Sequence, residues 1–90
     1  MSEHQKLNKR EANRNQLLKY LYDEVEGRTD KCIKKDDFIY KFSYQNEVSE
    51  EELESVFNYL KDAGLLEYIH GLGVYIRHSG INKIESLTKI

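Results

Sequence analysis

Apolar residues recur at helical spacing from Arg14 onward, where leucines and a valine fall on one side of a predicted helix. We expect this helix to run from about residue 10 to residue 26, with Gly27 as its stop. The residues before it are polar, apart from one large aliphatic side chain, and define no apolar face. We therefore expect residues 1–13 to form a frayed helix start or a mobile basic arm, and residues 14–90 to form the domain. The apolar stripe consists of Leu17, Leu18, Leu21 and Val25.

A polar connector follows, and the next apolar pair predicts a very short strand at 32–33, with Cys32 as a small buried residue. Asp36 is then well placed to cap a second helix, because its carboxylate can accept hydrogen bonds from the free amides of the first turn. We expect this helix to span about seven residues and to be broken by the polar stretch 43–46. Its apolar face consists of Phe38, Ile39 and Phe42.

The clearest helix signal is the capping box that begins at Ser49. In such a box the serine hydroxyl accepts a hydrogen bond from the amide of Glu52, and the Glu52 carboxylate can reach back. The three consecutive glutamates also suit the positive end of a helix dipole. The helix is expected to end at Gly64, and its apolar stripe consists of Leu53, Val56, Phe57 and Leu60.

Beyond Gly64 the pattern becomes that of strands. Two β-rich runs at 65–70 and 74–78 flank a loop at 71–73, which we interpret as a three-residue hairpin turn with Gly73 in the left-handed conformation. A two-residue Gly-Leu turn is an alternative, but it mixes the two faces of the hairpin. In the preferred register one face holds Leu66, Tyr68, Val74 and Ile76, and the other holds Glu67, Ile69, Tyr75 and Arg77. Ser79 and Gly80 are expected to close the second strand, and a last short helix is marked by Ile81, Ile84, Leu87 or Thr88, and Ile90.

This order of elements predicts an α+β winged helix-turn-helix, in which the second and third helices form the helix-turn-helix and the hairpin is the wing. The segments 60–66 (LKDAGLL) and 75–81 (YIRHSGI) resemble the end of many small prokaryotic winged-helix domains. Those domains often run helix, Gly, Leu-Ile, hairpin, Ile-Thr-x-x-Gly, helix. The resemblance covers roughly residues 14–90. It implies a three-helix core with a C-terminal two-stranded wing and a short terminal helix, and it implies DNA binding or transcriptional regulation as the function.

Charge limits how such a domain could bind DNA. The chain has 14 Lys and Arg against 16 Asp and Glu, and a formal net charge of −2. Winged-helix proteins usually lay their third helix into the major groove. Here the side of that helix opposite the apolar stripe is acidic, with Glu51, Ser55, Asn58 and Asp62, and the tip of the wing is uncharged. Lysines and arginines gather instead near the N-terminus and before the second helix, where Lys31 lies close to two more lysines. The candidate DNA-binding residues are Lys6, Lys9, Arg10, Arg14, Lys34, Lys35, Ser55, Asn58 and Arg77.

A protein-interaction module is the competing interpretation. Seven tyrosines and three phenylalanines are more than so small a core can bury, and exposed tyrosines are typical of protein interfaces. The tyrosines that cannot all be buried are Tyr20, Tyr40, Tyr44, Tyr59 and Tyr75. The last helix is expected to pack either against the first helix or against a second copy of the chain, which would make a homodimer. The candidate interface residues are Glu51, Asn58, Tyr59, Asp62, Ile84 and Ile90.

The residues predict no enzyme, no cofactor and no metal site. His70 and His78 are expected at opposite ends of the hairpin, and the adjacent carboxylates are explained by helix starts. None of the glycines precedes a helix in a phosphate-binding loop, and one cysteine excludes a disulfide within the chain. The longest apolar runs are two or three residues and the N-terminus is polar, so we expect a soluble cytoplasmic protein with no secretory signal.

Overall fold

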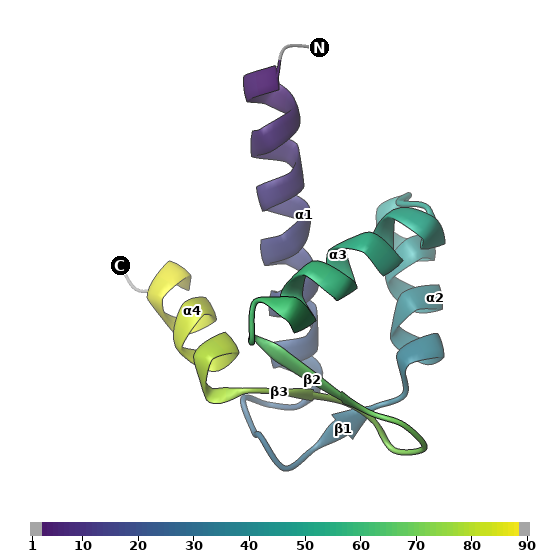
Figure 1. Ribbon diagram of the computed structural model, residues 1–90, viewed down its shortest axis with the longest axis vertical. Coiled ribbons are helices and arrows are strands. Elements are labelled where there is room, and N and C mark those ends of the chain that lie inside the picture. The colour runs from purple at the N-terminus through teal and green to yellow at the C-terminus, as the bar shows by residue number, and fades with distance from the viewer. Residues whose placement is uncertain (1–2, 89–90) are drawn as a thin grey trace.

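A computed structural model describes the backbone of residues 3–88 and the side chains of residues 9–88. In this part of the chain the fold is α+β, with four helices and one three-stranded antiparallel sheet (Figure 1). The elements are α1 (Glu3–Glu24), β1 (Cys32–Ile33), α2 (Lys35–Asn46), α3 (Glu50–Asp62), β2 (Leu66–Ile69), β3 (Gly73–Ile76) and α4 (His78–Thr88). Between residues 3 and 88, no helix combines the length and the apolar character that crossing a membrane requires.

The core lies where the C-terminal half of α1, α2 and α3 meet one face of the sheet (Figure 1). The apolar stripes predicted from the sequence supply it, so those predictions are confirmed. Phe57 of α3 lies deep in this core, with its ring centroid 5.8 Å from that of Phe38 and 6.2 Å from that of Tyr68. The buried apolar residues are Leu17, Leu18, Leu21, Val25, Phe38, Ile39, Phe42, Leu53, Val56, Phe57, Leu60, Leu66, Val74, Ile76 and Ile84.

The first helix begins at Glu3, earlier than the expected start near residue 10. Its first turns stand above the rest of the protein (Figure 1). The segment contains no glycine, proline or β-branched residue before Arg14, and most of its residues favour helix intrinsically. Hydrophobic periodicity could not detect this part of the helix, because a helix turn without a packing partner needs no apolar stripe.

The second helix is longer than expected, and two predictions about its ends are wrong. Its N-cap is Lys34, whose side chain makes no capping hydrogen bond, and Asp36 lies within the first turn. The polar stretch 43–46 continues the helix, because its side chains bond to nearby carbonyls: Ser43 Oγ to Val48 O, and Asn46 Nδ2 to Phe42 O at 3.1 Å. The helix ends at Asn46, and its C-cap residue Glu47 has a positive φ of 53°.

The third helix agrees with its prediction. The Ser49 hydroxyl accepts a hydrogen bond from the Glu52 amide at 3.1 Å, and the chain leaves the helix at Ala63 and Gly64, the latter with φ of 80°. The second bond of the expected capping box is replaced by a tertiary contact. The Glu52 carboxylate accepts a hydrogen bond from the buried Asn13 side chain of α1 at 3.2 Å.

The two faces of the hairpin are as predicted, but the register is not: Leu66 lies opposite Ile76 and Tyr68 opposite Val74, whereas a loop at 71–73 would place Tyr68 opposite Ile76. Its three-residue loop lies one residue earlier than expected, at 70–72, because β3 begins at Gly73. The Leu72 amide donates to Ile69 O at 3.0 Å, and this turn places Gly71 at φ 87°. Gly73 also has a positive φ, of 137°, but as the first residue of a strand.

Cys32 is exposed, so the prediction of a buried cysteine is wrong. β1 is an edge strand that pairs with β3, with Cys32 opposite Tyr75 and Ile33 opposite Val74. Neighbouring residues of a strand point to opposite faces. Ile33 therefore packs toward the core with Val74, and the cysteine takes the outer face.

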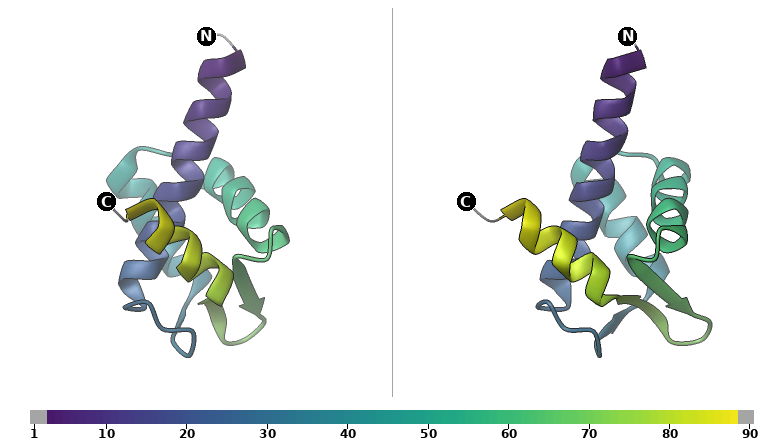
Figure 2. Two further views of the ribbon diagram at one scale, coloured as in Figure 1. Left: turned by 90° about the vertical axis from the view of Figure 1, so that its left-hand side faces the viewer. Right: turned by 60° about the vertical axis from the view of Figure 1, so that its left-hand side comes forward.

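The last helix packs against the C-terminal half of α1 (Figure 2). Ile84 is 2 % exposed, and Tyr22 of α1 donates a hydrogen bond to Glu85 at 3.3 Å. The core-packing alternative is therefore confirmed for Ile84, which is not available as an interface residue. The helix begins at His78, so Ser79 and Gly80 lie in its first turn and do not close the strand. Ile90, the other predicted interface residue of this helix, lies outside the described residues.

Candidate functional site

The most extensive polar surface that the sequence predicted is the outer face of α3, which we define by Glu51, Ser55, Asn58 and Asp62. All four side chains are exposed, because the stripe from Leu53 to Leu60 turns the opposite side of the helix toward the core. The two carboxylates give this face a negative charge, and the serine and the amide can donate and accept hydrogen bonds. The face can therefore bind a partner that carries positive charge.

An arginine of α1 borders one flank of this face. The Arg14 guanidinium carbon lies 3.5 Å from the centroid of the Tyr59 ring, which is the geometry of a cation–π contact. Next to this pair, a cleft of about 570 Å³ separates α1 from α3, and its lining includes Arg10, Glu51 and Glu52. The flank therefore carries charges of both signs, and Arg14 is held against the tyrosine.

A lysine of α2 borders the other flank. Lys35 Nζ lies 2.8 Å from a carboxylate oxygen of Glu54 on α3, and its side chain is mostly buried. The same ammonium group lies 5.1 Å from the centroid of the Phe57 ring and 5.8 Å from that of Tyr68. Lys35 is therefore bound within the protein, by an ion pair and by two aromatic rings.

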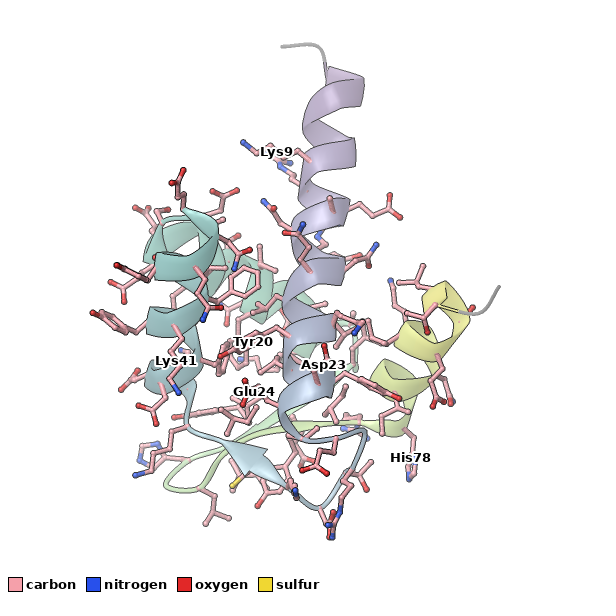
Figure 3. The ribbon with its side chains drawn as sticks, turned by 180° about the vertical axis from the view of Figure 1, so that it is seen from behind. Lys9, Tyr20, Asp23, Glu24, Lys41 and His78 are labelled. Atoms are coloured by element: carbon pink, nitrogen blue, oxygen red, sulfur yellow. The ribbon has the colours of Figure 1, made fainter. Side chains whose placement is uncertain are left out.

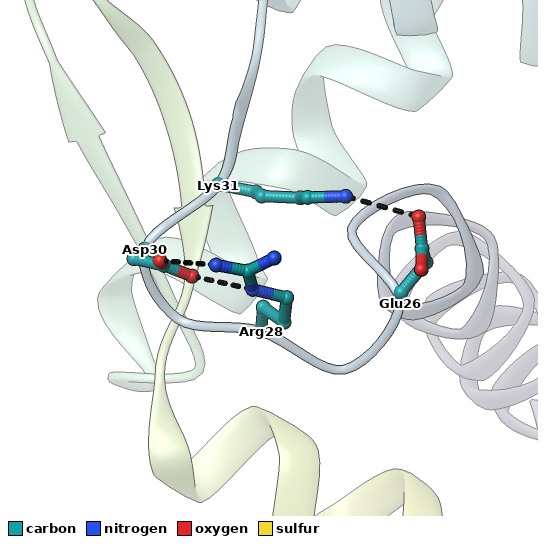
Figure 4. Close-up of polar contacts among 4 residues, drawn as sticks. All are labelled: Glu26, Arg28, Asp30 and Lys31. Carbon is teal, nitrogen blue, oxygen red and sulfur yellow. Dashed lines mark hydrogen bonds and ion pairs between the residues drawn. The ribbon is translucent and has the colours of Figure 1, made fainter.

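The lysine cluster expected before α2 is also partly neutralised. Lys31 Nζ lies 2.9 Å from Glu26, and Arg28 forms two hydrogen bonds with Asp30, the shorter one at 2.7 Å (Figure 4). These hydrogen bonds lower the pKa of Glu26 and of Asp30 below their usual values. The small stabilisation they supply is therefore present above the ordinary carboxylate range and fades as the pH falls through the lowered pKa values. Of the three clustered lysines, only Lys34 makes no ion pair with any residue whose side chain is described.

The remaining predicted cations do not join one surface. Lys9 and Arg10 are exposed on the N-terminal half of α1, and Figure 3 shows Lys9 high on this helix. Arg77 is exposed directly before His78, which Figure 3 shows at the opposite end of the protein. Lys6 lies in α1, but its side chain is outside the described part. The predicted DNA-binding residues are thus divided among the free end of α1, the flanks of α3 and the base of the hairpin.

Several tyrosines are exposed, as predicted. Tyr40 is 66 % exposed and Tyr44 is 81 % exposed, and they lie one helical turn apart on α2. Tyr20 is partly buried against Phe42, with ring centroids 5.6 Å apart, and burial followed by the nearby Glu24 carboxylate raises its pKa. Tyr75 is also partly buried on the outer face of the sheet, where a hydrogen bond with Cys32 is the main cause of its raised pKa.

The contacts that bind Arg14 and Lys35 were not found from the sequence. The residues of each pair lie far apart along the chain, and no local pattern joins Arg14 to Tyr59 or Lys35 to Glu54. The exposure of Tyr68 was also missed, because the hairpin register assigned it to the core face. It lies on that face, but close to the open edge of the sheet.

The histidines and carboxylates lie where the sequence predicted. His70 is in the hairpin turn, and His78 begins α4. Among residues 3–88, no three His, Cys, Asp or Glu side chains gather in a way that could hold a metal ion.

No protein-family model matches this chain, and neither the curated proteins nor the solved structures contain a match to it.

Proposed function

We propose that the chain is a winged-helix domain that acts as a protein-interaction module, and that it binds a positively charged protein surface through the outer face of α3. The order of helices around a small antiparallel sheet supports the winged-helix assignment. The proposed protein-interaction role rests on one observation. The face that a winged-helix protein usually presents to its partner is exposed and acidic here, and two of the cations beside it, Arg14 and Lys35, are in contact with Tyr59 and Glu54.

Electrostatics favours a protein over duplex DNA at this face. DNA carries one negative charge per about 1.7 Å of helix axis, so α3 in a groove would bring Glu51 and Asp62 close to phosphates. Lys35 could offset this repulsion only by giving up its ion pair with Glu54, and the Arg14 guanidinium lies at one flank of the face, against Tyr59. A protein surface rich in lysine or arginine meets no such repulsion.

Tyr59 is suited to anchor such a contact. Its ring is 45 % exposed at the edge of the outer face, and Arg14 covers one side of it. A tyrosine that is already held in place adds apolar area to an interface and loses little conformational entropy on binding.

This proposal predicts that a Lys/Arg-rich peptide shifts the backbone NMR signals of the outer face of α3 at low salt. The double variant Glu51→Lys/Asp62→Lys should abolish these shifts, because it reverses the charge of the face. Both side chains are exposed, so the free energy of unfolding should fall by no more than about 1 kcal/mol, mainly because a lysine replaces Glu51 in the first turn of α3. Urea unfolding followed by circular dichroism measures that change.

The matched control is Asp36→Lys/Asp37→Lys, which makes the same charge change at exposed sites in the first turn of α2. The control should keep the shifts on α3. Equal loss of binding in both double variants would mean that the peptide senses only net charge, and it would reject the outer face of α3 as the binding surface.

DNA binding is the second candidate, favoured by the exposed Lys9 and Arg10 on the part of α1 that extends beyond the core (Figure 3). If this segment anchors phosphates, binding to mixed-sequence duplex DNA should weaken steeply with salt. Each phosphate contact contributes about 0.9 to the slope of log affinity against log salt concentration. Replacing Lys6, Lys9, Arg10 and Arg14 together with glutamine should flatten that slope. No retention of duplex DNA by the unmodified protein at low salt would reject this candidate.

A further inference from the structure

A cleft lies on the face of the sheet that α1, α2 and α3 leave uncovered. The core occupies the other face, so alternate side chains of the hairpin point away from it (Figure 1). The cleft has a volume of about 590 Å³, within the usual range of about 300–1,000 Å³ for small-molecule sites. Its lining includes Thr29, Glu67, Ile69, Tyr75, Arg77 and His78.

The fold holds the walls of this cleft in place. The loop before β1, which forms one wall, is closed by the ion pair of Arg28 with Asp30 at 2.7 Å (Figure 4). At the start of α4, the Ser79 hydroxyl donates a hydrogen bond to Gly64 O at 2.6 Å. Tyr75, which is partly buried, lies between these two walls on β3. The cleft is therefore formed before any ligand binds.

The groups that line the cleft follow a fixed order along the hairpin. Arg77 lies at its base, Glu67 lies opposite Tyr75 in the middle, and Ile69, which is 38 % exposed, lies next to the turn. Glu67 and Arg77 are diagonal neighbours across the two strands, a relation that places residues about 7–8 Å apart on one face. Neither forms an ion pair with a residue whose side chain is described. The cleft thus offers one cation and one anion, with an apolar residue beyond them.

We propose that this cleft binds a free α-amino acid with an apolar side chain. The carboxylate of the ligand pairs with the Arg77 guanidinium, and its ammonium group pairs with the Glu67 carboxylate. Its apolar side chain lies along Ile69. Carboxylate, ammonium and apolar chain follow one another in such a ligand in the same order as their partners along the hairpin.

The two charges select this ligand over simpler ones. A carboxylic acid without an amine would bring its negative charge close to Glu67, and an amine without a carboxylate would bring its positive charge close to Arg77. An α-amino acid carries both charges on one carbon atom and offers each residue an opposite charge. Its side chain removes apolar surface of Ile69 from water. The cleft and the outer face of α3 are different surfaces, so this inference does not depend on the proposed function.

An NMR titration with L-leucine tests the site. The ion-pairing residues are exposed, so we expect weak binding, with a dissociation constant of about 1 mM. The backbone signals of Glu67, Ile69 and Arg77 should shift. Leucine without its amine is 4-methylpentanoate, and leucine without its carboxylate is 3-methylbutylamine; each should bind about tenfold more weakly. No shifts in the hairpin with leucine, or equal affinities for the three compounds, would overturn the proposal.

Two substitutions test the role of each charge. In Glu67→Gln the ammonium group loses its partner, so leucine should bind about tenfold more weakly and lose its advantage over 4-methylpentanoate. In Arg77→Gln leucine should weaken by a similar factor and lose its advantage over 3-methylbutylamine. Both residues are exposed, so thermal unfolding followed by circular dichroism should be nearly unchanged.

The matched controls are Asp37→Asn and Lys41→Gln, which remove one charge of each sign at exposed sites of α2, outside the lining of the cleft. They should bind leucine as the unmodified protein does. Equal weakening in the controls and in the cleft variants would indicate a response to net charge. Unchanged binding in both cleft variants would place the ligand elsewhere, and either result would overturn the proposed site.

Discussion

Phe57→Ala is expected to lower the free energy of unfolding by about 3–5 kcal/mol, the usual cost of removing a buried aromatic side chain. The ring is 1 % exposed and packs between the helices and the sheet, next to Phe38 of α2 and Tyr68 of β2. Its loss would leave a cavity between the helices and the sheet, and would remove one of the two rings next to the Lys35 ammonium. Native proteins are stable by about 5–15 kcal/mol, and a domain of this size lies near the lower end of that range, so this variant should be at most marginally folded.

Urea unfolding followed by circular dichroism measures this loss. Phe57→Leu should cost less than the alanine variant, because leucine fills most of the volume. Tyr40→Ala removes another large aromatic residue from an exposed position and should change stability by no more than about 0.5 kcal/mol. If Phe57→Ala unfolded at the same urea concentration as the unmodified protein, the core would not be packed around this ring.

Gly73→Ala should have the next largest effect. Gly73 has φ of 137°, and a Cβ atom on it would lie 2.6 Å from the backbone oxygen of Ile33. The atoms that this Cβ would meet belong to the backbone of Ile33 and Lys34, so relief requires β1 to move away from β3. Backbone strain of this kind costs about 1–3 kcal/mol, and the loss of pairing between the two strands adds to it.

Gly71→Ala is the matched control, because φ is also positive there, at 87°, but no atom lies within 4 Å of the added Cβ. It should show the cost of the backbone conformation alone. Hydrogen exchange at Val74 should become faster in the Gly73 variant and stay unchanged in the control, since Val74 pairs with Ile33 of β1. Equal destabilisation in both variants would mean that β1 yields to the added methyl group at no cost.

Local signals predicted the elements that depend on local physics. The Ser49 cap, the stripe from Leu53 to Leu60 and the alternation along the hairpin each arise from residues within one helix turn or one strand pair. The prediction was wrong where tertiary context decides. Cys32 is exposed because β3 and the core fix which side of β1 faces inward, and a two-residue strand carries no alternation from which to infer it.

The sequence predicted which residues belong to the candidate site, but not how their side chains are placed relative to one another. The helical periodicity of α3 correctly predicted that one exposed side of the helix holds Glu51, Ser55, Asn58 and Asp62. The sequence could not show that Arg14 lies over Tyr59 or that Lys35 pairs with Glu54, because both contacts depend on how α1 and α2 pack against α3. These contacts bear on what the surface can bind, because they already engage two of the cations that a DNA contact would use.

The exposed Cys32 makes spectroscopic labelling straightforward. It is the only cysteine in the sequence, and it lies on the outer face of the sheet at the edge opposite β2. A nitroxide attached there needs no engineered mutation. Its electron paramagnetic resonance spectrum would report directly on how firmly β1 is held against β3.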